Sequence, residues 1–338
     1  MMKHQTGLLY SGDYARHLTR PMHPEKPERV RYAYEHLKKQ AFFETLSPLN
    51  PSQAETKWIH EIHSPAYVEH VKNTCLNGNP VIDSLDTEIS HDSYEVACLA
   101  VGGALALVDG VMSGKIQNGL GLIRPPGHHA EKEMALGFCL FNNVAIAARY
   151  IQKKYRLKRI LIVDWDVHHG NGTQNVFYED PSVFYFSVHQ YPFYPGTGAS
   201  EEEGKREGWG TTLNVPLPAG CGDKEYREVF RKVLCPRAVE FSPEFILISA
   251  GFDAHQNDPL GHMNVTTEGY REMTEAVKSI AEECASGRIV SLLEGGYDLQ
   301  ALAESVQVHL EVLMDSKIKW PLGKKKIRTK SLKVSKKS

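Results

Sequence analysis

The sequence predicts an α/β fold in a single domain, with a central, mostly parallel β-sheet flanked by helices. Short, continuously apolar runs recur along the chain, and such runs are typical of parallel strands that are buried on both faces. Helical stretches separate these runs, and each run ends in polar or glycine-rich residues. Because open α/β sheets place their sites beyond the carboxyl ends of the strands, we expect the functional residues at that edge.

Five apolar runs are the strongest strand candidates, and each leads directly into a polar motif. In chain order they are 120–123 before Arg124-Pro-Pro-Gly, 160–163 before Asp164, 183–186 before Ser187, 245–248 before Ser249, and 289–293 before Glu294-Gly-Gly-Tyr297. Helices are expected over residues 142–154, 224–239 and 267–284, where the pattern changes to the helical period. No internal repeat interrupts this order.

Composition excludes several classes of protein. An apolar share of 41% over 338 residues supports a large core, and a net charge of −2 does not indicate binding to nucleic acid or membrane. The six cysteines form no CxxC pair, which favours reduced thiols and a cytoplasmic location. We find no stretch long enough to span a bilayer. The oligomeric state is left open.

The C-terminal end differs in composition from the rest of the chain. Residues 324–338 contain eight Lys or Arg and no acid. We expect a catalytic domain over 1–320 and a basic, disordered tail over 321–338, which is solvated or docks on an acidic partner or RNA.

Three residues that follow predicted strands are candidate metal ligands. Asp166 and His168 are separated by one residue, so both side chains face the same way if the segment stays extended. Asp253 follows another strand and supplies a third ligand. Three protein ligands with an open position are typical of a catalytic zinc, although Fe(II) or Co(II) would also suit two carboxylates and an imidazole.

A tandem histidine pair is the candidate for proton transfer. His128 and His129 follow a stiff Pro-Pro-Gly turn, and imidazoles change charge near neutral pH. Each ring needs an orienting acceptor, for which Asp164 and Asn171 are the candidates. Because a carboxylate raises the proton affinity of a histidine more than an amide does, we expect unequal pKa values for the two rings.

A tyrosine near the end of the last strand candidate could stabilise an oxyanion. Tyr297 follows two glycines, which let the backbone approach a site closely. Its hydroxyl could donate to the oxygen of a tetrahedral intermediate. A packed tyrosine with an exposed hydroxyl is the plainer interpretation of the same residue.

These segments together resemble the zinc-dependent histone deacetylase family, which includes acetylpolyamine amidohydrolases and has the arginase/deacetylase fold. The motifs occur in family order between His23 and Tyr297: HPEKPER, RPPGHHA, GFCLFNN, DWDVHHGNGTQ, YPGTG, SAGFDAH and LEGGYD. The resemblance implies that Asp166, His168 and Asp253 bind zinc. It also implies catalytic roles for the tandem histidines and their partners: His129 as general base and acid, His128 as an electrostatic group, Asp164 as its orienter, Asn171 in place of the class I Asp, and Tyr297 at the oxyanion.

The same resemblance implies substrate and potassium sites. Phe138 and Tyr194 would form a tunnel around the methylenes of acetyl-lysine, with Gly137 and Leu260 beside them and Asp92 at the rim. A structural potassium ion would be held by Asp164, Asp166, His168, Ser187 and the carbonyl of Val188. The expected function is therefore removal of acetyl groups from lysine side chains of proteins or peptides by zinc-activated water.

Three alternatives are weighed against this function. A binuclear arginase-like hydrolase needs further metal ligands where this chain has Gly170 and His255. Acetylpolyamine deacetylation would favour an acidic gate; polyamine-selective members of the family carry Glu at the position of Leu260, although Glu201-Glu-Glu203 could supply acidity. A non-enzymatic acetyl-lysine reader would be expected to lack the tandem histidines or Tyr297.

Overall fold

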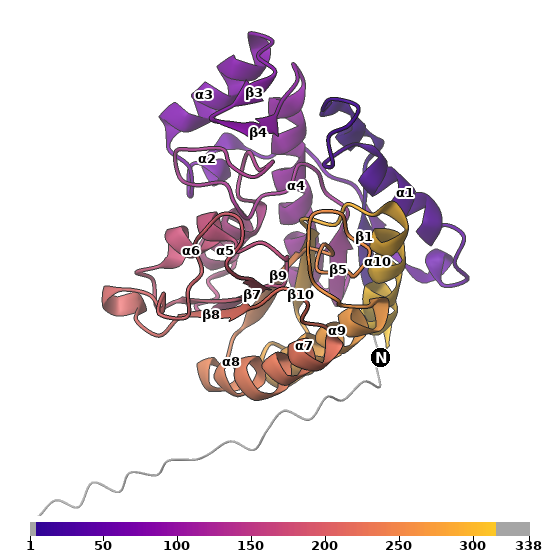
Figure 1. Ribbon diagram of the computed structural model, residues 1–338, viewed down its shortest axis with the longest axis vertical. Helices are drawn as coiled ribbons and strands as arrows, with labels where there is room; N and C mark the ends of the chain where they lie inside the picture. The colour runs from indigo at the N-terminus through magenta and orange to yellow at the C-terminus, as the bar shows by residue number, and fades with distance from the viewer. Residues whose placement is uncertain (1–4, 316–338) are drawn as a thin grey trace, which may run out of the picture.

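The computed structural model describes residues 5–315, which form one open eight-stranded sheet between two layers of helices (Figure 1). All neighbouring strand pairs in this sheet are parallel. The predicted α/β class and single parallel sheet are therefore confirmed. The predicted basic tail, 321–338, lies outside the described residues.

The strand order places all five of the predicted strands side by side in the sheet. From one edge to the other the strands are β2 (Ser47–Leu49), β1 (Thr6–Leu9), β5 (Asn118–Gly121), β10 (Ile289–Leu293), β9 (Phe245–Ala250), β6 (Ile160–Asp164), β7 (Val183–Gln190) and β8 (Thr212–Leu217). A separate antiparallel pair, β3 (Val81–Ile82) and β4 (Ser84–Glu88), stands apart from the main sheet, in the region of α3 in Figure 1.

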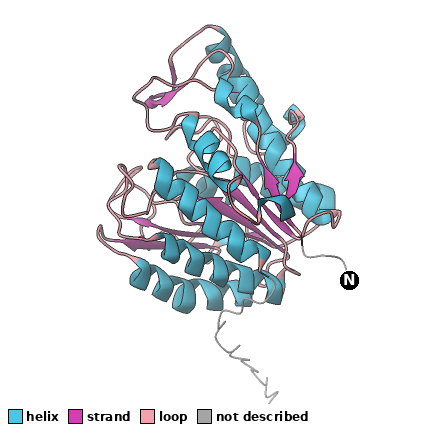
Figure 2. Cartoon of the chain, turned by 90° about the vertical axis from the view of Figure 1, so that its right-hand side faces the viewer, coloured by secondary structure: helices cyan, strands magenta, loops and turns pink. Residues whose placement is uncertain are grey.

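Helices cover both faces of the sheet (Figure 2). One layer contains α1 (Glu28–Leu37), α7 (Asp223–Val229), α8 (Cys235–Phe241), α9 (Thr267–Cys284) and α10 (Leu299–Met314). The other contains α2 (Thr56–Ile59), α3 (Pro65–Leu76), α4 (Ser93–Met112), α5 (Asn143–Tyr155) and α6 (Asn171–Phe177). Short 3₁₀ segments lie at Gly12–Arg16, Phe43–Thr45 and Arg206–Gly208.

Side-chain caps explain where several of these helices begin. Asn142 accepts a hydrogen bond from the Ala145 amide at the start of α5, and Thr266 caps α9 through Gly269. The predicted helix over 224–239 is broken in the structure. A π-helical turn at Phe230–Leu234 separates α7 from α8, and Pro236, which has no N–H for the preceding turn, follows it.

One helix corrects the expectation that no stretch could span a bilayer. Within residues 5–315, α4 has the length and apolar composition of a membrane span. However, 78% of its most apolar window is buried inside the protein, which is the position of a core helix. Gly102 lets this helix pack closely, because a Cβ atom there would lie 1.6 Å from the Ser52 carbonyl oxygen.

The parallel arrangement brings the polar motifs to one edge of the sheet. Strands β5, β10, β9 and β6 are consecutive neighbours, so the segments that follow their carboxyl ends meet there. Register reinforces this, since Asp164 at the end of β6 pairs with Ser249 on β9 and with Ser187 on β7.

All six cysteines are free, as their scattered spacing predicted.

Candidate active site

Three ligand-bearing residues converge beyond strands β6 and β9. Asp166, His168 and Asp253 are buried, and one ligand atom from each lies within 4.8 Å of the other two. His168 Nδ1 is 3.1 Å from Asp166 Oδ1 and 3.2 Å from Asp253 Oδ2. The structure therefore brings together the three residues that the sequence predicted as metal ligands.

The surroundings of Asp253 show that this group fits a divalent cation. Its Oδ1 accepts a hydrogen bond from the Val167 amide, but its Oδ2 is buried without any hydrogen bond. His168 Nδ1 lies only 3.2 Å from this oxygen, but the two atoms are not aligned for a hydrogen bond. Burial, followed by the Asp166 carboxylate, raises the pKa of Asp253 to about 7. A bound cation would satisfy the free oxygen and offset the repulsion between two buried carboxylates.

Two glycines leave the space that these carboxylates occupy. A Cβ atom at Gly295 would lie 2.1 Å from Asp253 Oδ2, and one at Gly251 would lie 2.2 Å from Asp166 Oδ2. The Gly295 amide also donates to Asp166 Oδ2 at 2.8 Å. Close backbone approach thus positions the carboxylates.

The tandem histidines lie against this group with their ring centroids 4.0 Å apart. His128 Nδ1 is 3.1 Å from Asp164 Oδ2, and His129 Nδ1 is 2.7 Å from Asn171 Oδ1, so each ring has the partner that the sequence suggested. The turn that carries them is fixed by Glu294, whose Oε2 accepts hydrogen bonds from the amides of Gly127 and His128.

The two rings have opposite pKa shifts. Burial alone would lower the pKa of His128, but the carboxylates of Asp164 and Asp166 outweigh it and raise the value to about 10. For His129, burial together with the neighbouring His128 and His168 holds the pKa well below its ordinary value, and Asn171 only partly opposes this. The unequal pKa values agree with the expectation from a carboxylate partner on one ring and an amide on the other.

A pocket of about 110 Å³ leads to His129 and His168. The ring of Tyr194 stands perpendicular to that of His129 at 5.3 Å, and Phe138 meets Tyr297 edge-on at 5.9 Å. The lining includes the predicted substrate and oxyanion residues Gly137, Phe138, Tyr194, Leu260 and Tyr297.

Asp92 is not among the residues that line this pocket. Its carboxylate lies at the N-terminus of α4, 3.0 Å from Arg16 Nε and 3.1 Å from His91 Nδ1. Asp86 on β4 lines the pocket instead. Asp86 shares this lining with Tyr194, and burial together with the Asp86 carboxylate raises the pKa of Tyr194. The sequence carried no clear signal for Asp86, because β4 is a short strand without an apolar pattern.

Asp258 joins two walls of the pocket and was not recognised as a site residue from the sequence. Its Oδ1 accepts a hydrogen bond from the Leu260 amide at 2.9 Å, and its Oδ2 accepts one from the Tyr297 amide at 2.6 Å. One carboxylate therefore sets the positions of both residues.

A buried ionic cluster of Glu25, Arg29 and Arg124 lies next to Tyr297, and in the sequence these residues stand out only as parts of motifs. Arg29 donates to the carbonyl of Gly296 at 2.6 Å, and its guanidinium carbon lies 4.8 Å from the centre of the Tyr297 ring. Glu25 Oε1 receives Arg29 at 3.2 Å and Arg124 at 2.6 Å. An acid and an arginine four residues apart in HPEKPER, together with the arginine of RPPGHHA, were the available signal.

The five residues of the predicted potassium site lie on neighbouring strands and their loops. Asp164 and Ser187 are paired across β6 and β7, Val188 follows on β7, and all are buried. Asp166 and His168 follow Asp164 in the adjoining loop.

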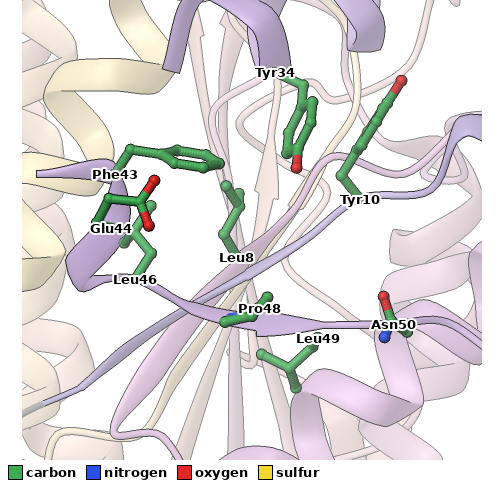
Figure 3. A pocket seen from close by; sticks show the side chains of 9 residues that line it. All are labelled: Leu8, Tyr10, Tyr34, Phe43, Glu44, Leu46, Pro48, Leu49 and Asn50. Carbon is green, nitrogen blue, oxygen red and sulfur yellow. The ribbon is translucent and has the colours of Figure 1, made fainter. Parts of the chain in front are cut away.

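A second hollow is larger but contains neither the candidate metal ligands nor the tandem histidines. It measures about 240 Å³ and lies over β1 and β2, where Figure 3 shows Phe43 and Tyr34 on either side of Leu8. Its lining contains one carboxylate, Glu44, and no histidine. The smaller pocket, which reaches the metal-ligand group, is therefore the candidate active site.

Comparisons with known proteins agree with the fold and give the family. A model of the histone deacetylase domain matches residues 23–313. The chain is 40% identical over 297 residues to a probable deacetylase of Archaeoglobus fulgidus, covering 87% of this chain and 82% of that protein. It is 42% identical over 301 residues to the polyamine deacetylase HDAC10 of Homo sapiens, covering 86% of this chain but only 44% of that protein.

A solved structure has the same fold. The crystal structure of the HDA15 HD domain superposes with a TM-score of 0.86 at 37% identity, covering 92% of this chain and 88% of that chain. With these matches and the buried Asp-His-Asp group, the chain belongs to the histone deacetylase family and is a hydrolytic deacetylase.

Proposed function

We propose that this chain removes acetyl groups from lysine side chains of proteins or peptides, with a zinc ion held by Asp166, His168 and Asp253. The observation that supports this most directly is the free, buried Oδ2 of Asp253 beneath a pocket walled by Phe138 and Tyr194. Aromatic walls suit an apolar methylene stem, and ligands at the base suit the polar amide at its end. Fe(II) or Co(II) remain alternatives for the same ligand set.

When bound, a divalent cation at this site polarises the substrate carbonyl and lowers the pKa of water. His129 acts as the base, because its depressed pKa keeps Nε2 unprotonated at neutral pH. His128 is held as a cation by Asp164 and Asp166, so it stabilises the negative charge that develops nearby. As the C–N bond breaks, protonated His129 gives the proton that it took from water to the nitrogen of the departing lysine amine.

Tyr297 supplies the remaining hydrogen bond. Burial raises the pKa of Tyr297 well above its ordinary value, so the phenol keeps its proton and can donate to the substrate oxygen. Arg29, which lies over the ring, and Asp258, which holds its backbone, keep the phenol in place. No covalent intermediate is needed, and the six cysteines have no role in this scheme.

Acetylpolyamine deacetylation is the second candidate, and two observations favour it. Asp86 places a carboxylate at the pocket that could attract a cationic amine. Two relatives, HDAC10 of Homo sapiens and HDAC10 of Mus musculus, are named polyamine deacetylases. Against it, Leu260 is an apolar residue in the wall. Glu202 is turned inward to the amides of Gly198 and Ala199, so it does not supply the acidic gate.

We also propose a structural potassium ion at Asp164, Asp166, His168, Ser187 and the Val188 carbonyl. Their shared burial on β6, β7 and the following loop supports this. A cytoplasmic location is proposed from the free cysteines.

The test compares turnover of an acetyl-lysine peptide with turnover of N-acetylputrescine and N-acetylspermidine by one zinc-loaded preparation. We expect the peptide to have the highest kcat/KM. A higher kcat/KM for either polyamine would make acetylpolyamines the preferred substrates in place of acetyl-lysine peptides. The chain would still be a deacetylase. Asp253→Ala tests the ligand assignment: it should lose both zinc and turnover. An Asp253→Ala variant that kept its zinc content would contradict the assignment.

A further inference from the structure

A partly exposed carboxylate, Glu131, is linked to His129 by hydrogen bonds through Asn171. Asn171 Oδ1 is 2.7 Å from His129 Nδ1, while Asn171 Nδ2 donates to Glu131 Oε1 at 2.6 Å. Glu131 lies two residues after His129 and also accepts a hydrogen bond from Asn175 Nδ2 at 2.8 Å. Glu131 itself does not line the active-site pocket.

The direction of these hydrogen bonds follows from the chemistry of the groups. An ionised carboxylate only accepts, so the amide of Asn171 must present its NH₂ to Glu131. Its carbonyl oxygen then faces His129 and can only accept from Nδ1. The proton of the neutral imidazole is therefore held on Nδ1, which leaves the lone pair of Nε2 as the base.

We propose that Glu131 is a positioning residue that selects the catalytic tautomer of His129 by fixing the orientation of the Asn171 amide. The role in turnover rests on the proposed deacetylase function, whereas the effect on the tautomer does not. Asn171 is a neutral partner that could turn over and present its NH₂ to the ring. Two acceptors hold the amide in one orientation: Asn171 Nδ2 donates to the Glu131 carboxylate at 2.6 Å and, at the longer distance of 3.4 Å, to the His129 carbonyl.

The loop around Glu131 is built to keep the carboxylate in place. His63 Nε2 accepts a hydrogen bond from the Asn142 amide, so its Nδ1 carries the proton and donates to the Glu131 carbonyl at 2.9 Å. The Glu131 amide donates to the carbonyl of Met134 at 2.9 Å. The side chain is only partly buried, at a crevice lined also by Arg149 and Asn175. Its acceptor oxygen thus points from a fixed backbone toward Asn171.

A series of substitutions separates acceptor from donor at this position. Glu131→Gln keeps an acceptor oxygen and should stay within about twofold of wild type, whereas Glu131→Ala should lower kcat about tenfold with KM unchanged. Glu131→Lys offers only donors, forces the Asn171 oxygen away from His129, and should lower kcat by about 100-fold. Glu133→Ala, which removes an exposed acid from the same loop, is the matched control and should match wild type.

The second readout is the tautomer itself, measured in the zinc-loaded enzyme by ¹⁵N NMR with labelled histidine. The His129 signals are identified by their loss in His129→Gln. We expect Nδ1–H in wild type and in Glu131→Gln, a mixture of tautomers in Glu131→Ala, and Nε2–H in Glu131→Lys.

Several outcomes would overturn the proposal. An unchanged His129 tautomer in both Glu131→Ala and Glu131→Lys would remove the positioning role, as would wild-type kcat in Glu131→Lys. A Glu131→Gln enzyme as impaired as Glu131→Ala would show that charge matters rather than an acceptor. If wild type hydrolyses neither class of substrate, the proposed function fails, and the NMR comparison still decides the role of Glu131.

Discussion

Replacing Gly295 by alanine should disable the metal site without unfolding the protein. The backbone of Gly295 is not left-handed, so alanine can adopt its conformation. The added Cβ atom would, however, lie 2.1 Å from Asp253 Oδ2 and 2.6 Å from Asp166 Oδ2. Because Cβ atoms essentially never approach a neighbour closer than 3.0 Å, the Asp253 oxygen must retreat by about 1 Å.

The loss of zinc affinity can be estimated from how little displacement of its ligands a metal site tolerates. Ligand distances in working sites vary by about 0.2 Å, so a shift of about 1 Å should weaken zinc binding on the order of 100-fold. At a zinc concentration about 100 times the wild-type Kd, ligand binding stabilises the folded state by about 2.7 kcal/mol. The variant would then be at its own Kd and keep only about 0.4 kcal/mol.

The metal-free protein should still fold. The Oδ2 of Asp253 has no hydrogen bond to lose, but Asp166 Oδ2, which accepts from the Gly295 amide, must also move, so the overpacking should cost about 1–3 kcal/mol. Calorimetric zinc titration and thermal unfolding with and without zinc measure both quantities. Gly12→Ala, where no atom lies within 4 Å of the new Cβ, is the control. Wild-type zinc affinity in Gly295→Ala would refute the steric reasoning.

Three further predictions test other parts of the site. Tyr297→Phe should lower kcat on the order of 100-fold with zinc content unchanged, measured by steady-state kinetics and metal analysis; near-normal turnover would remove the phenol from the scheme. Leu260→Glu should raise kcat/KM for N-acetylspermidine relative to acetyl-lysine peptide by about tenfold, or about 1.4 kcal/mol, and an unchanged ratio would exclude this position as a selector. Glu25 has its pKa lowered to about 2, because Arg124 and Arg29 outweigh the opposing effect of burial. Its stabilising contribution should therefore be full above pH 4.5 and lost toward pH 2. Urea unfolding should show wild type losing about 3 kcal/mol more than Glu25→Gln over that range, and parallel curves would contradict it.

The central strands could be predicted because their burial on both faces leaves no polar alternation. The runs at β6, β9 and β10 begin at the predicted residues. Edge strand β2 has no such signal: it is three residues long and contains Pro48, which is tolerated where no neighbour needs its N–H. The break between α7 and α8 also escaped prediction, because the apolar pattern continues through the π-helical turn.

The convergence of the candidate metal ligands could be predicted because strand ends fix their direction, whereas the positions of residues on irregular loops could not. Asp86 and Asp92 are acids in one segment, and only the fold decides which one lines the pocket. The same holds for the second His-His pair. His168 faces the carboxylates, while His169 turns away to Thr197 and is 2.8 Å from its hydroxyl.

The distribution of hydrogen bonds decides which side chains can carry protons. The buried carboxylates mostly accept bonds from loop amides: Glu294 holds Gly127 and His128, Asp166 holds His168 and Gly295, and Asp258 holds Leu260 and Tyr297. Protonating any of them would weaken the hydrogen bonds that fix its loop. Among the carboxylates of the candidate metal-ligand group, Asp253 is the one with a buried oxygen, Oδ2, that has no hydrogen bond. In the proposed scheme, proton transfer is therefore assigned to His129 and hydrogen-bond donation to Tyr297, and the acids act by fixing the geometry of both.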